Sequence, residues 1–556
     1  MEKNSNASEL HIIDSPADFP VNWEDSADAH IPWEQEAPHF PQSLTPMDYD
    51  FSAYKITEGL NKGAAHYRLP MVQRVCNLNT YAYIANVPMP PPPEGVDEEK
   101  LKATIGNLSE IWNNEWLPEL KEHIAYWQAF DLSGADMTAL QAHLEETERR
   151  VARMWEIHFH LAFPMLLAVT FFEEMYQDIM EDVSQLDVYA LLTEVENNTV
   201  ESSIELWKLS RQALANSVVC SVMETTAPSQ VMEALSETPE GKTFLNSLNE
   251  YLQNYGERID KLYVSFPAWN ENPTPLISNL KAYMAQPDRD LLAEMDETVA
   301  ERERSVAKAR EKVANYPKPV VEKFEFLLKA AQQGYFLKEE HTSWIDFQAT
   351  YHARQAVLEC GRRLQDAAVI ESKDDVFYLT LSELKETIAT PSPEHRQTLV
   401  RERRAKETHF SQLTPPPRLG IIPQGAPPNN PVIRAIGKVF GAPPPQSENP
   451  AELLGLAGSR GVVRGTAKVL HSLDEASKLE QGDILVAATT TPPWTPIFAN
   501  IAAVVTDSGG ILSHPAVIAR EYGIPAVVGT AQSTSVIKDG QMIEVDGDKG
   551  IVRILS

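Results

Sequence analysis

The chain has 556 residues, of which 43% are hydrophobic, and a formal net charge of −31 at pH 7. This length exceeds what one hydrophobic core can organise and predicts about three or four domains. The acidic balance argues against nucleic acid as a main partner, because binding to phosphates requires clustered Lys and Arg side chains.

The cysteines and the apolar runs indicate the cellular compartment. Cys76, Cys220 and Cys360 lie far apart, and no CxxC pair occurs, so a disulfide framework or zinc cluster is not expected. The start, MEKNSNASELHIID, lacks the apolar stretch of a signal peptide. The longest apolar run, LAFPMLLAVTFF at 161–172, is too short to span a bilayer. We therefore expect a soluble cytoplasmic protein without a membrane partner.

Residues 1–96 are rich in Pro, Trp and Asp. Trp23 and Trp33 need an apolar surface to pack against. We expect an extended N-terminal segment that packs on the following domain, ending near the proline-rich spacer VPMPPPPEGVD at 87–97.

Residues 97–413 have a helical pattern. Stretches such as EEKLKATIGNLSEIWNNEWLPEL place apolar residues three and four positions apart. Prolines then gather in TPPPRLGIIPQGAPPNNP and GAPPPQSENP, so 414–455 is interpreted as a proline-rich linker.

Residues 456–556 have a different texture. Short Val, Ile and Ala runs such as GDILVAA and AAVVTD alternate with glycine-containing turns, which predicts buried strands. The expected fold is multidomain: a mostly α-helical domain followed by a small α/β domain of about 100 residues.

The stretch GGILSHPAVIAREYGIP places His514 where a glycine-rich turn becomes a helix. Ser513 or His514 would cap that helix, and Pro515 fits its first turn. The positive end of the helix holds an imidazole neutral, so that a ring nitrogen is available as a nucleophile. It would also stabilise a phosphoryl group on that nitrogen, together with the Ser513 hydroxyl. The pattern alone leaves open a histidine that only caps the helix.

The longer stretch TDSGGILSHPAVIAREYGIPAVVGT resembles the phosphohistidine swivelling domain of the phosphoenolpyruvate-utilising enzymes. It departs from the family pattern at Asp507-Ser508 in the turn and at Pro515. The resemblance implies that His514 is phosphorylated during the catalytic cycle. It also assigns supporting positions around the phosphate to Thr506, Gly509, Gly510, Ser513 and Arg520.

Other domains of that family have no counterpart in the sequence. No stretch resembles the ATP-grasp domain that loads the histidine, or the phosphoenolpyruvate-binding barrel of phosphoenolpyruvate synthase. The resemblance therefore implies a separate ATP-grasp subunit as partner, which would bind ATP and Mg²⁺.

The helical region resembles the acceptor domain of rifampin phosphotransferase. It is more similar to the large subunit of phenylphosphate synthase and of alkylphenol phosphate synthases, on the stretches at 255–284 and 339–384. This implies a small phenolic substrate, and the reaction ATP + phenol + water → aryl phosphate + AMP + phosphate. Two alternatives remain: an antibiotic hydroxyl as acceptor, and a non-enzymatic phosphohistidine regulator.

Transfer to a phenol requires a base for its proton and cations for the moving charge. His341 with Glu340 is the candidate base pair, and Arg354 is the candidate phosphate clamp. Each of these could equally be a surface or salt-bridge residue, and Arg362 and Arg363 are further candidates for the clamp.

The helix RMWEIHFHLAFPMLLAVTFFEEMY at 153–176 is the candidate wall of the acceptor pocket. It would present Trp155, Phe159 and Phe163 at helical spacing, with His158 pointing into the pocket; ordinary core packing gives the same pattern. His158 and His160 lie about 200° apart on a helix, which makes them a poor metal pair. No metal site is expected.

Overall fold

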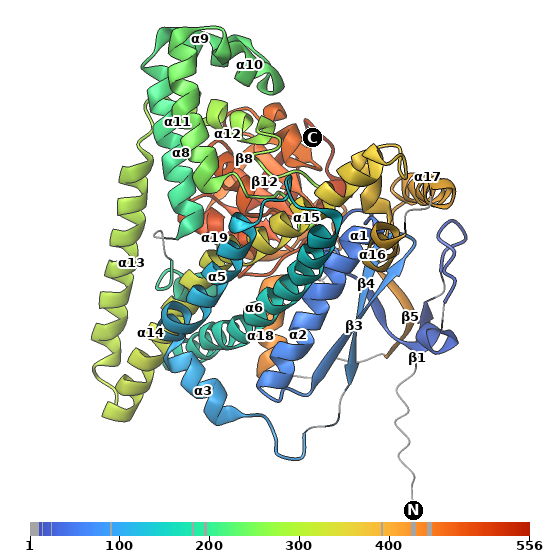
Figure 1. Ribbon diagram of the computed structural model, residues 1–556. Helices are drawn as coiled ribbons and strands as arrows, with labels where there is room; N and C mark the ends of the chain where they lie inside the picture. The colour runs from blue at the N-terminus through green and yellow to red at the C-terminus, as the bar shows by residue number, and fades with distance from the viewer. Residues whose placement is uncertain are drawn as a thin grey trace, which may run out of the picture.

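The computed structural model describes residues 10–13, 15–23, 25–88, 90, 92–180, 183–193, 197–390, 393–423, 430–441 and 447–555. Parts of the proline-rich stretches, at 89, 91, 424–429 and 442–446, lie outside the described residues, as does the start of the chain at 1–9. The chain forms a large, mostly helical region followed by a small C-terminal α/β domain, which confirms the predicted fold class (Figure 1).

The N-terminal segment contains more regular structure than the expected extended wrap. A five-stranded antiparallel sheet has the order β1-β5-β2-β4-β3. Its hairpin turns at Asn79 and Thr80, which both have positive φ (51° and 73°), as a tight two-residue turn requires. Trp33 is buried and Trp23 stacks on it with ring centroids 6.4 Å apart. The elements are β1 (Leu10–Ile13), β2 (Trp33–Gln35), α1 (Pro46–Asp48), α2 (Lys55–His66), β3 (Met71–Leu78) and β4 (Tyr81–Pro88).

The helical region is organised around α6, a helix of 43 residues. It is the one described helix long and apolar enough to cross a membrane by length and composition, and 78% of its most apolar window is buried inside the protein. Helices α2, α14 and α15 pack along it. The helices are α3 (Glu98–Gly106), α4 (Leu108–Ile111), α5 (Leu117–Ala129), α6 (Met137–Ile179), α7 (Gln185–Tyr189), α8 (Asn198–Leu214), α9 (Ser217–Thr225), α10 (Val231–Ser236), α11 (Pro239–Tyr255), α12 (Thr274–Met284), α13 (Leu291–Val313), α14 (Lys318–Trp344), α15 (Asp346–Asp366), α16 (Leu381–Ala389) and α17 (Pro393–Phe410).

Helices α14 and α15 are separated by a single residue, Ile345. Its backbone angles (φ −113°, ψ −65°) depart from helical values, while its N–H still bonds the carbonyl of His341 at 2.8 Å. The break therefore places the last turn of α14 beside the first residue of α15.

The expected linker is partly built into the fold. Strand β5 (Arg418–Pro423) joins the N-terminal sheet between β1 and β2. Helix α18 (Pro431–Phe440) packs against α6, as Figure 1 shows. A short helix before the second proline cluster was expected, and α18 is that helix. Proline richness did not predict strand β5, because strand pairing depends on distant segments.

The C-terminal domain contains an eight-stranded sheet of order β6-β13-β12-β8-β9-β10-β11-β7, in which β8 to β11 run parallel. The strands are β6 (Glu452–Leu454), β7 (Leu456–Ser459), β8 (Val462–Leu470), β9 (Ile484–Ala487), β10 (Ala503–Thr506), β11 (Ala526–Val528), β12 (Met542–Asp546) and β13 (Ile551–Ile554). The helical segments are the 3-10 segments η6 (Leu473–Lys478) and η7 (Pro492–Ala499) and the helices α19 (His514–Glu521) and α20 (Ser533–Val536).

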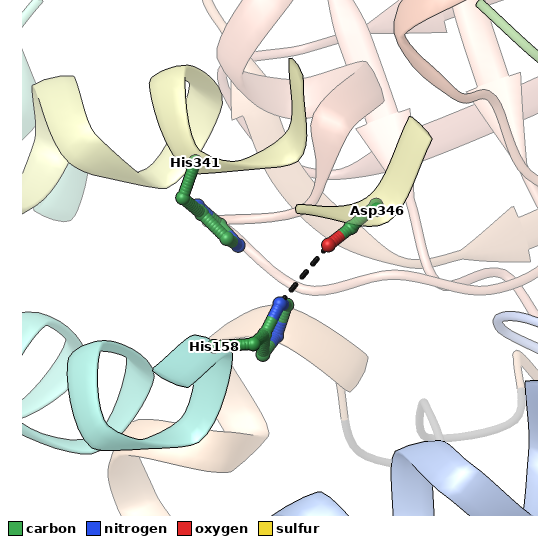
Figure 2. Close-up of side chains that lie close together, drawn as sticks. All are labelled: His158, His341 and Asp346. Atoms are coloured by element: carbon green, nitrogen blue, oxygen red, sulfur yellow. Dashed lines mark hydrogen bonds and ion pairs between the residues drawn. The ribbon is translucent and has the colours of Figure 1, made fainter. Parts of the chain in front are cut away.

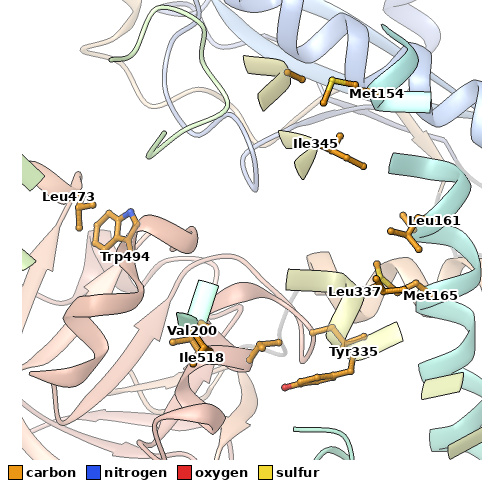
Figure 3. Packing of buried hydrophobic residues seen from close by; sticks show 14 of the residues in the cluster. Met154, Leu161, Met165, Val200, Tyr335, Leu337, Ile345, Leu473, Trp494 and Ile518 are labelled. Carbon is orange, nitrogen blue, oxygen red and sulfur yellow. The ribbon is translucent and has the colours of Figure 1, made fainter. Parts of the chain in front are cut away.

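The C-terminal domain is docked on the helical region, and the two share an apolar cluster. Figure 3 shows Tyr335 and Leu337 of α14 in the same cluster as Trp494 and Ile518 of the C-terminal domain. Polar contacts cross the same interface. Arg460 pairs with Asp187 at 2.6 Å, Thr491 donates to the Asp260 carbonyl at 2.8 Å, and the hydroxyls of Tyr283 and Tyr522 lie 3.3 Å apart.

Candidate functional site

His514 is the first residue of α19, directly after the turn that follows β10. Gly509 in this turn has φ +114°, which favours glycine. Ser513 is the N-cap residue, but its hydroxyl donates to the Gly510 carbonyl at 2.7 Å instead of capping the helix. Pro515 occupies the first turn, as the sequence predicts.

The remaining predicted supporting residues hold this turn rather than the imidazole. The Thr506 hydroxyl donates to the Ser508 carbonyl at 2.8 Å. Arg520 donates to the carbonyls of Gly458 and Ile511, at 2.7 and 2.9 Å.

The turn is also docked on α18. The N–H of Gly510 donates to the Val439 carbonyl at 2.7 Å, and a Cβ at Gly510 would overlap the carbonyl oxygen of Lys438. A glycine is required here because the turn and the end of α18 approach so closely.

The ring of His514 lies between the two parts of the molecule. Its Nδ1 is 3.4 Å from Oε2 of Glu339 on α14, and its Nε2 is 3.5 Å from the Thr495 hydroxyl on η7. The edge of the Phe498 ring approaches it with centroids 6.2 Å apart. The side chains of His514 and Glu339 are only 9% and 3% exposed, so this contact is screened from bulk water.

Glu339 is held ionised by its neighbours. Burial opposes its charge, but Lys338 at 2.6 Å and the hydrogen bond from His514 keep the pKa of this carboxyl well below its usual range. Burial in turn lowers the pKa of His514, while Glu339 acts in the opposite direction. A neutral His514 then donates its Nδ1–H to Glu339 and keeps a lone pair on Nε2, beside Thr495. This is the arrangement of an activated nitrogen nucleophile.

A second group of side chains forms on the other side of α14. Figure 2 shows His341 near the end of α14, His158 of α6 and Asp346 at the start of α15 turned toward one another. His158 Nδ1 lies 3.0 Å from Asp346 Oδ1, and the rings of His158 and His341 meet edge to face with centroids 4.6 Å apart.

His341 is neutral at physiological pH. Its Nδ1–H donates to the Leu337 carbonyl at 2.7 Å, and burial together with nearby His158 lowers its pKa to about 4. His341 is the residue predicted as the base, paired with Glu340. In the structure the ring of His341 contacts His158 instead, and Glu340 binds other residues.

Glu340 and Arg354 have their polar groups engaged in the fold. Glu340 accepts the backbone N–H of Asn198 and the indole N–H of Trp344, both at 2.9 Å. Arg354 pairs with Glu271 at 2.9 Å and donates to two carbonyls of the 264–265 loop. Arg362 and Arg363 both pair with Glu359 on their own helix.

The aromatic residues of the candidate pocket wall are mostly packed in the core. Trp155 and Phe163 are 2% and 4% exposed. A Cβ at Gly59 or Gly63 of α2 would overlap Trp155 or Phe159 of α6, so the two helices touch along this face. Their packing explains these aromatic residues, with Phe159 partly buried beside His158 at 4.7 Å between ring centroids.

Sequence reasoning missed Lys338, Glu339 and Thr495. The stretch FLKEEHTSW contains the signal, because Glu339 follows Tyr335 by four positions and so lies on the same helical face. The Tyr335 hydroxyl accepts from Arg520 at 3.2 Å, which marks that face as the docking surface for the C-terminal domain.

Comparison with known proteins agrees with this arrangement. Residues 479–550 match the family model described as PEP-utilising enzyme, mobile domain. Residues 158–339 match the model described as rifampicin phosphotransferase fourth domain. These matches cover the segments that bring His514 and Glu339 together.

Several curated proteins are similar to this chain. Chondramide synthase cmdD of Chondromyces crocatus is 36% identical over 98% of the chain, which corresponds to 14% of that protein. The uncharacterized phosphotransferase YvkC of Bacillus subtilis is 30% identical over 84% of the chain and 54% of its own length. A rifampicin phosphotransferase of Streptomyces sviceus is 32% identical over 58% of the chain and 36% of its own length. The chain thus spans about half or less of each relative.

Proposed function

We propose that this chain carries a phosphoryl group on Nε2 of His514 and transfers it to the hydroxyl of a small organic acceptor bound by the helical region. The observation that carries the proposal is the placement of His514 between Glu339 and Thr495, away from bulk water. A carboxylate on Nδ1 and an available Nε2 suit reversible phosphorylation of the ring.

The transfer step balances without an oxidant or reductant. The acceptor oxygen forms a bond to phosphorus as the Nε2–P bond breaks, and the electron pair of that bond returns to the imidazole. The proton of the acceptor hydroxyl ends on the ring, so that His514 returns to neutral imidazole. Lys338 pairs with Glu339, the carboxylate that faces Nδ1 of His514, and so adds a positive charge on that side of the ring.

The proposed acceptor is a phenol, such as 4-cresol, on the resemblance of 255–284 and 339–384 to aryl phosphate synthases. The match of 158–339 to a rifampicin phosphotransferase domain supports a second candidate, the hydroxyl of a larger antibiotic. The two candidates share the same phosphorylated histidine and differ in the size of the acceptor.

Loading of His514 is proposed to use ATP and Mg²⁺ on a separate ATP-grasp subunit. The overall reaction is ATP + acceptor + water → phosphorylated acceptor + AMP + phosphate. The docked position of the C-terminal domain corresponds to the delivery step, since His514 faces α14 and is buried there. Loading then requires this domain to leave the helical region.

The test combines the chain with the ATP-grasp subunit, ATP, Mg²⁺ and a panel of phenols and rifamycins. We expect AMP and one phosphorylated acceptor to appear, and neither to form with His514→Ala. Turnover by His514→Ala would refute the proposal. Phosphorylation of His514 without transfer to any small hydroxyl would instead support a regulatory protein.

A further inference from the structure

His158, His341 and Asp346 come from three helices and meet at one point. One nitrogen of each histidine and one carboxylate oxygen lie within 4.8 Å of one another. His341 and Asp346 are buried, and His158 is partly buried. His158 lies 188 positions before Asp346 and reaches the cluster through the packing of α6 on α14 and α15. His341 and Asp346 are close in the sequence, and the break at Ile345 sets their relative orientation.

We propose that His158, His341 and Asp346 bind one divalent transition-metal ion, such as Zn²⁺, Mn²⁺ or Fe²⁺. Two imidazoles and one carboxylate are a donor set that such ions favour, and that Mg²⁺ and Ca²⁺ do not. Three protein ligands leave further positions for water or another oxygen ligand.

The orientation of His341 supports this assignment. Its Nδ1–H is held by the Leu337 carbonyl at 2.7 Å, which fixes the tautomer and directs the lone pair of Nε2 away from its own helix. A metal-binding histidine characteristically has its other nitrogen held in this way by a carbonyl or carboxylate.

The separation of the other two ligand atoms fits as well. His158 Nδ1 donates a hydrogen bond to Asp346 Oδ1, with the two atoms 3.0 Å apart. When the ion binds, His158 takes the Nε2–H tautomer, so that the Nδ1 lone pair replaces this N–H and faces the ion. Two ligand atoms about 2.1 Å from an ion are separated by about 3.0 Å at the right angle of an octahedral site and by about 3.4 Å at the tetrahedral angle that Zn²⁺ prefers, so this pair fits with little movement. The lone pair of His341 Nε2 and the Asp346 carboxylate are both acceptors, so a cation between them would satisfy both.

The ion would join three elements of the helical region. It would connect the middle of α6 to the last turn of α14 and the first residue of α15. Binding to the folded state alone stabilises it, so the melting temperature should rise with metal concentration. This inference is independent of phosphoryl transfer and would hold if His514 were never phosphorylated.

The experiment uses the full chain after removal of metals with a chelator and of any affinity tag. Zn²⁺ and Co²⁺ are titrated by calorimetry, and Co²⁺ is followed by its visible absorption. We expect one equivalent to bind. In His158→Gln, His341→Gln and Asp346→Asn, affinity should fall by more than the ~10–100-fold that loss of an outer-shell partner costs.

His143→Gln is the matched control. His143 also lies buried on α6, where its Nδ1 contacts the Tyr126 hydroxyl at 3.1 Å, outside the three-residue cluster. It should keep wild-type affinity and the rise in melting temperature with Zn²⁺. Equal binding by the wild type and the three cluster variants would overturn the proposal, as would the absence of binding; the cluster would then be a hydrogen-bonded triad only.

A second measurement covers variants that fail to fold. Anomalous diffraction from wild-type crystals soaked in Zn²⁺ should place the ion about 2.0–2.2 Å from the three ligand atoms. An ion located elsewhere, with none at this position, would refute the assignment.

Discussion

Two histidines whose rings are largely shielded from water lie on opposite sides of the end of α14, and their partners differ. His514 faces the ionised carboxylate of Glu339, whereas His341 donates to the carbonyl of Leu337. Burial lowers the pKa of both rings. The carboxylate, however, stabilises positive charge that develops on its histidine, while a carbonyl mainly fixes the tautomer.

The partner of His514 suits a ring that forms and breaks a bond to phosphorus. The partner of His341 suits a ring that binds one ion and does not react. During loading and delivery the charge on His514 changes, so its environment must tolerate both states. His341 keeps one protonation state and one direction. Changes at each histidine should therefore affect different properties of the protein.

The largest effect is expected for Glu339→Gln. Without the carboxylate, the amide can hold His514 in the wrong tautomer and no longer stabilises positive charge on the ring. The rate of phosphoryl transfer should fall by roughly 10²–10⁴-fold, as when the carboxylate partner of a catalytic histidine is neutralised. Single-turnover decay of the phosphorylated protein measures this rate.

Glu322→Gln is the control for that variant, since Glu322 lies on the same helix with its side chain 65% exposed. It should transfer at the wild-type rate. If Glu339→Gln did the same, Glu339 would not be the partner of His514 during catalysis.

An intermediate effect is expected from acid acting on the helical region. The pKa of His341 is about 4 in the folded protein and about 6.5 when unfolded. The unfolded state therefore binds the proton more readily, so this contribution to stability is present above pH 6.5 and is lost as pH falls toward 4. Between pH 7 and pH 5 the loss should be about 2 kcal/mol.

Urea denaturation of the metal-free protein at both pH values measures this loss. His341→Gln, which cannot take up the proton, should lose less stability than the wild type over the same interval. An identical pH dependence in the two proteins would contradict the buried, neutral state of His341.

The smallest effect is expected for Thr495→Val. This change removes the hydroxyl that lies 3.5 Å from Nε2 of His514 and preserves the shape of the side chain. Loss of one neutral hydrogen bond costs about 1 kcal/mol, so transfer should slow by roughly 5-fold. Unchanged melting of this variant, together with slower transfer, would assign the hydroxyl to the phosphoryl group; an unchanged rate would remove it from the site.

The turn and helix around His514 were predictable because the residues that form them are neighbours in the sequence. The glycine turn, Ser513, His514 and the short helix are adjacent in the sequence, and steric rules give each its place. The helical region was not predictable to the same depth. Glu339 comes close to His514, and Asp346 to His158, only through packing between distant segments. The periodicity of the sequence does not reveal such packing.

The expectation that no metal site is present stays a prediction. It rested on His158 and His160, which one helix directs to different sides. The structure instead brings His158 to His341 and to Asp346, which lies 188 positions further along the chain. Likewise, β1 and β2 pair with β5 from far along the chain. The sequence predicted only an extended N-terminal segment and no such pairing.

Chemical phosphorylation of the chain tests whether His514 carries the phosphoryl group. The chain is phosphorylated with phosphoramidate, which requires no partner subunit, and the site is located by ³¹P NMR coupled to the imidazole protons. We predict one acid-labile phosphoryl group on Nε2 of His514, which moves to a hydroxyl when a phenol or rifamycin is added. A phosphoryl group on another residue, or equal labelling of His514→Ala, would contradict it.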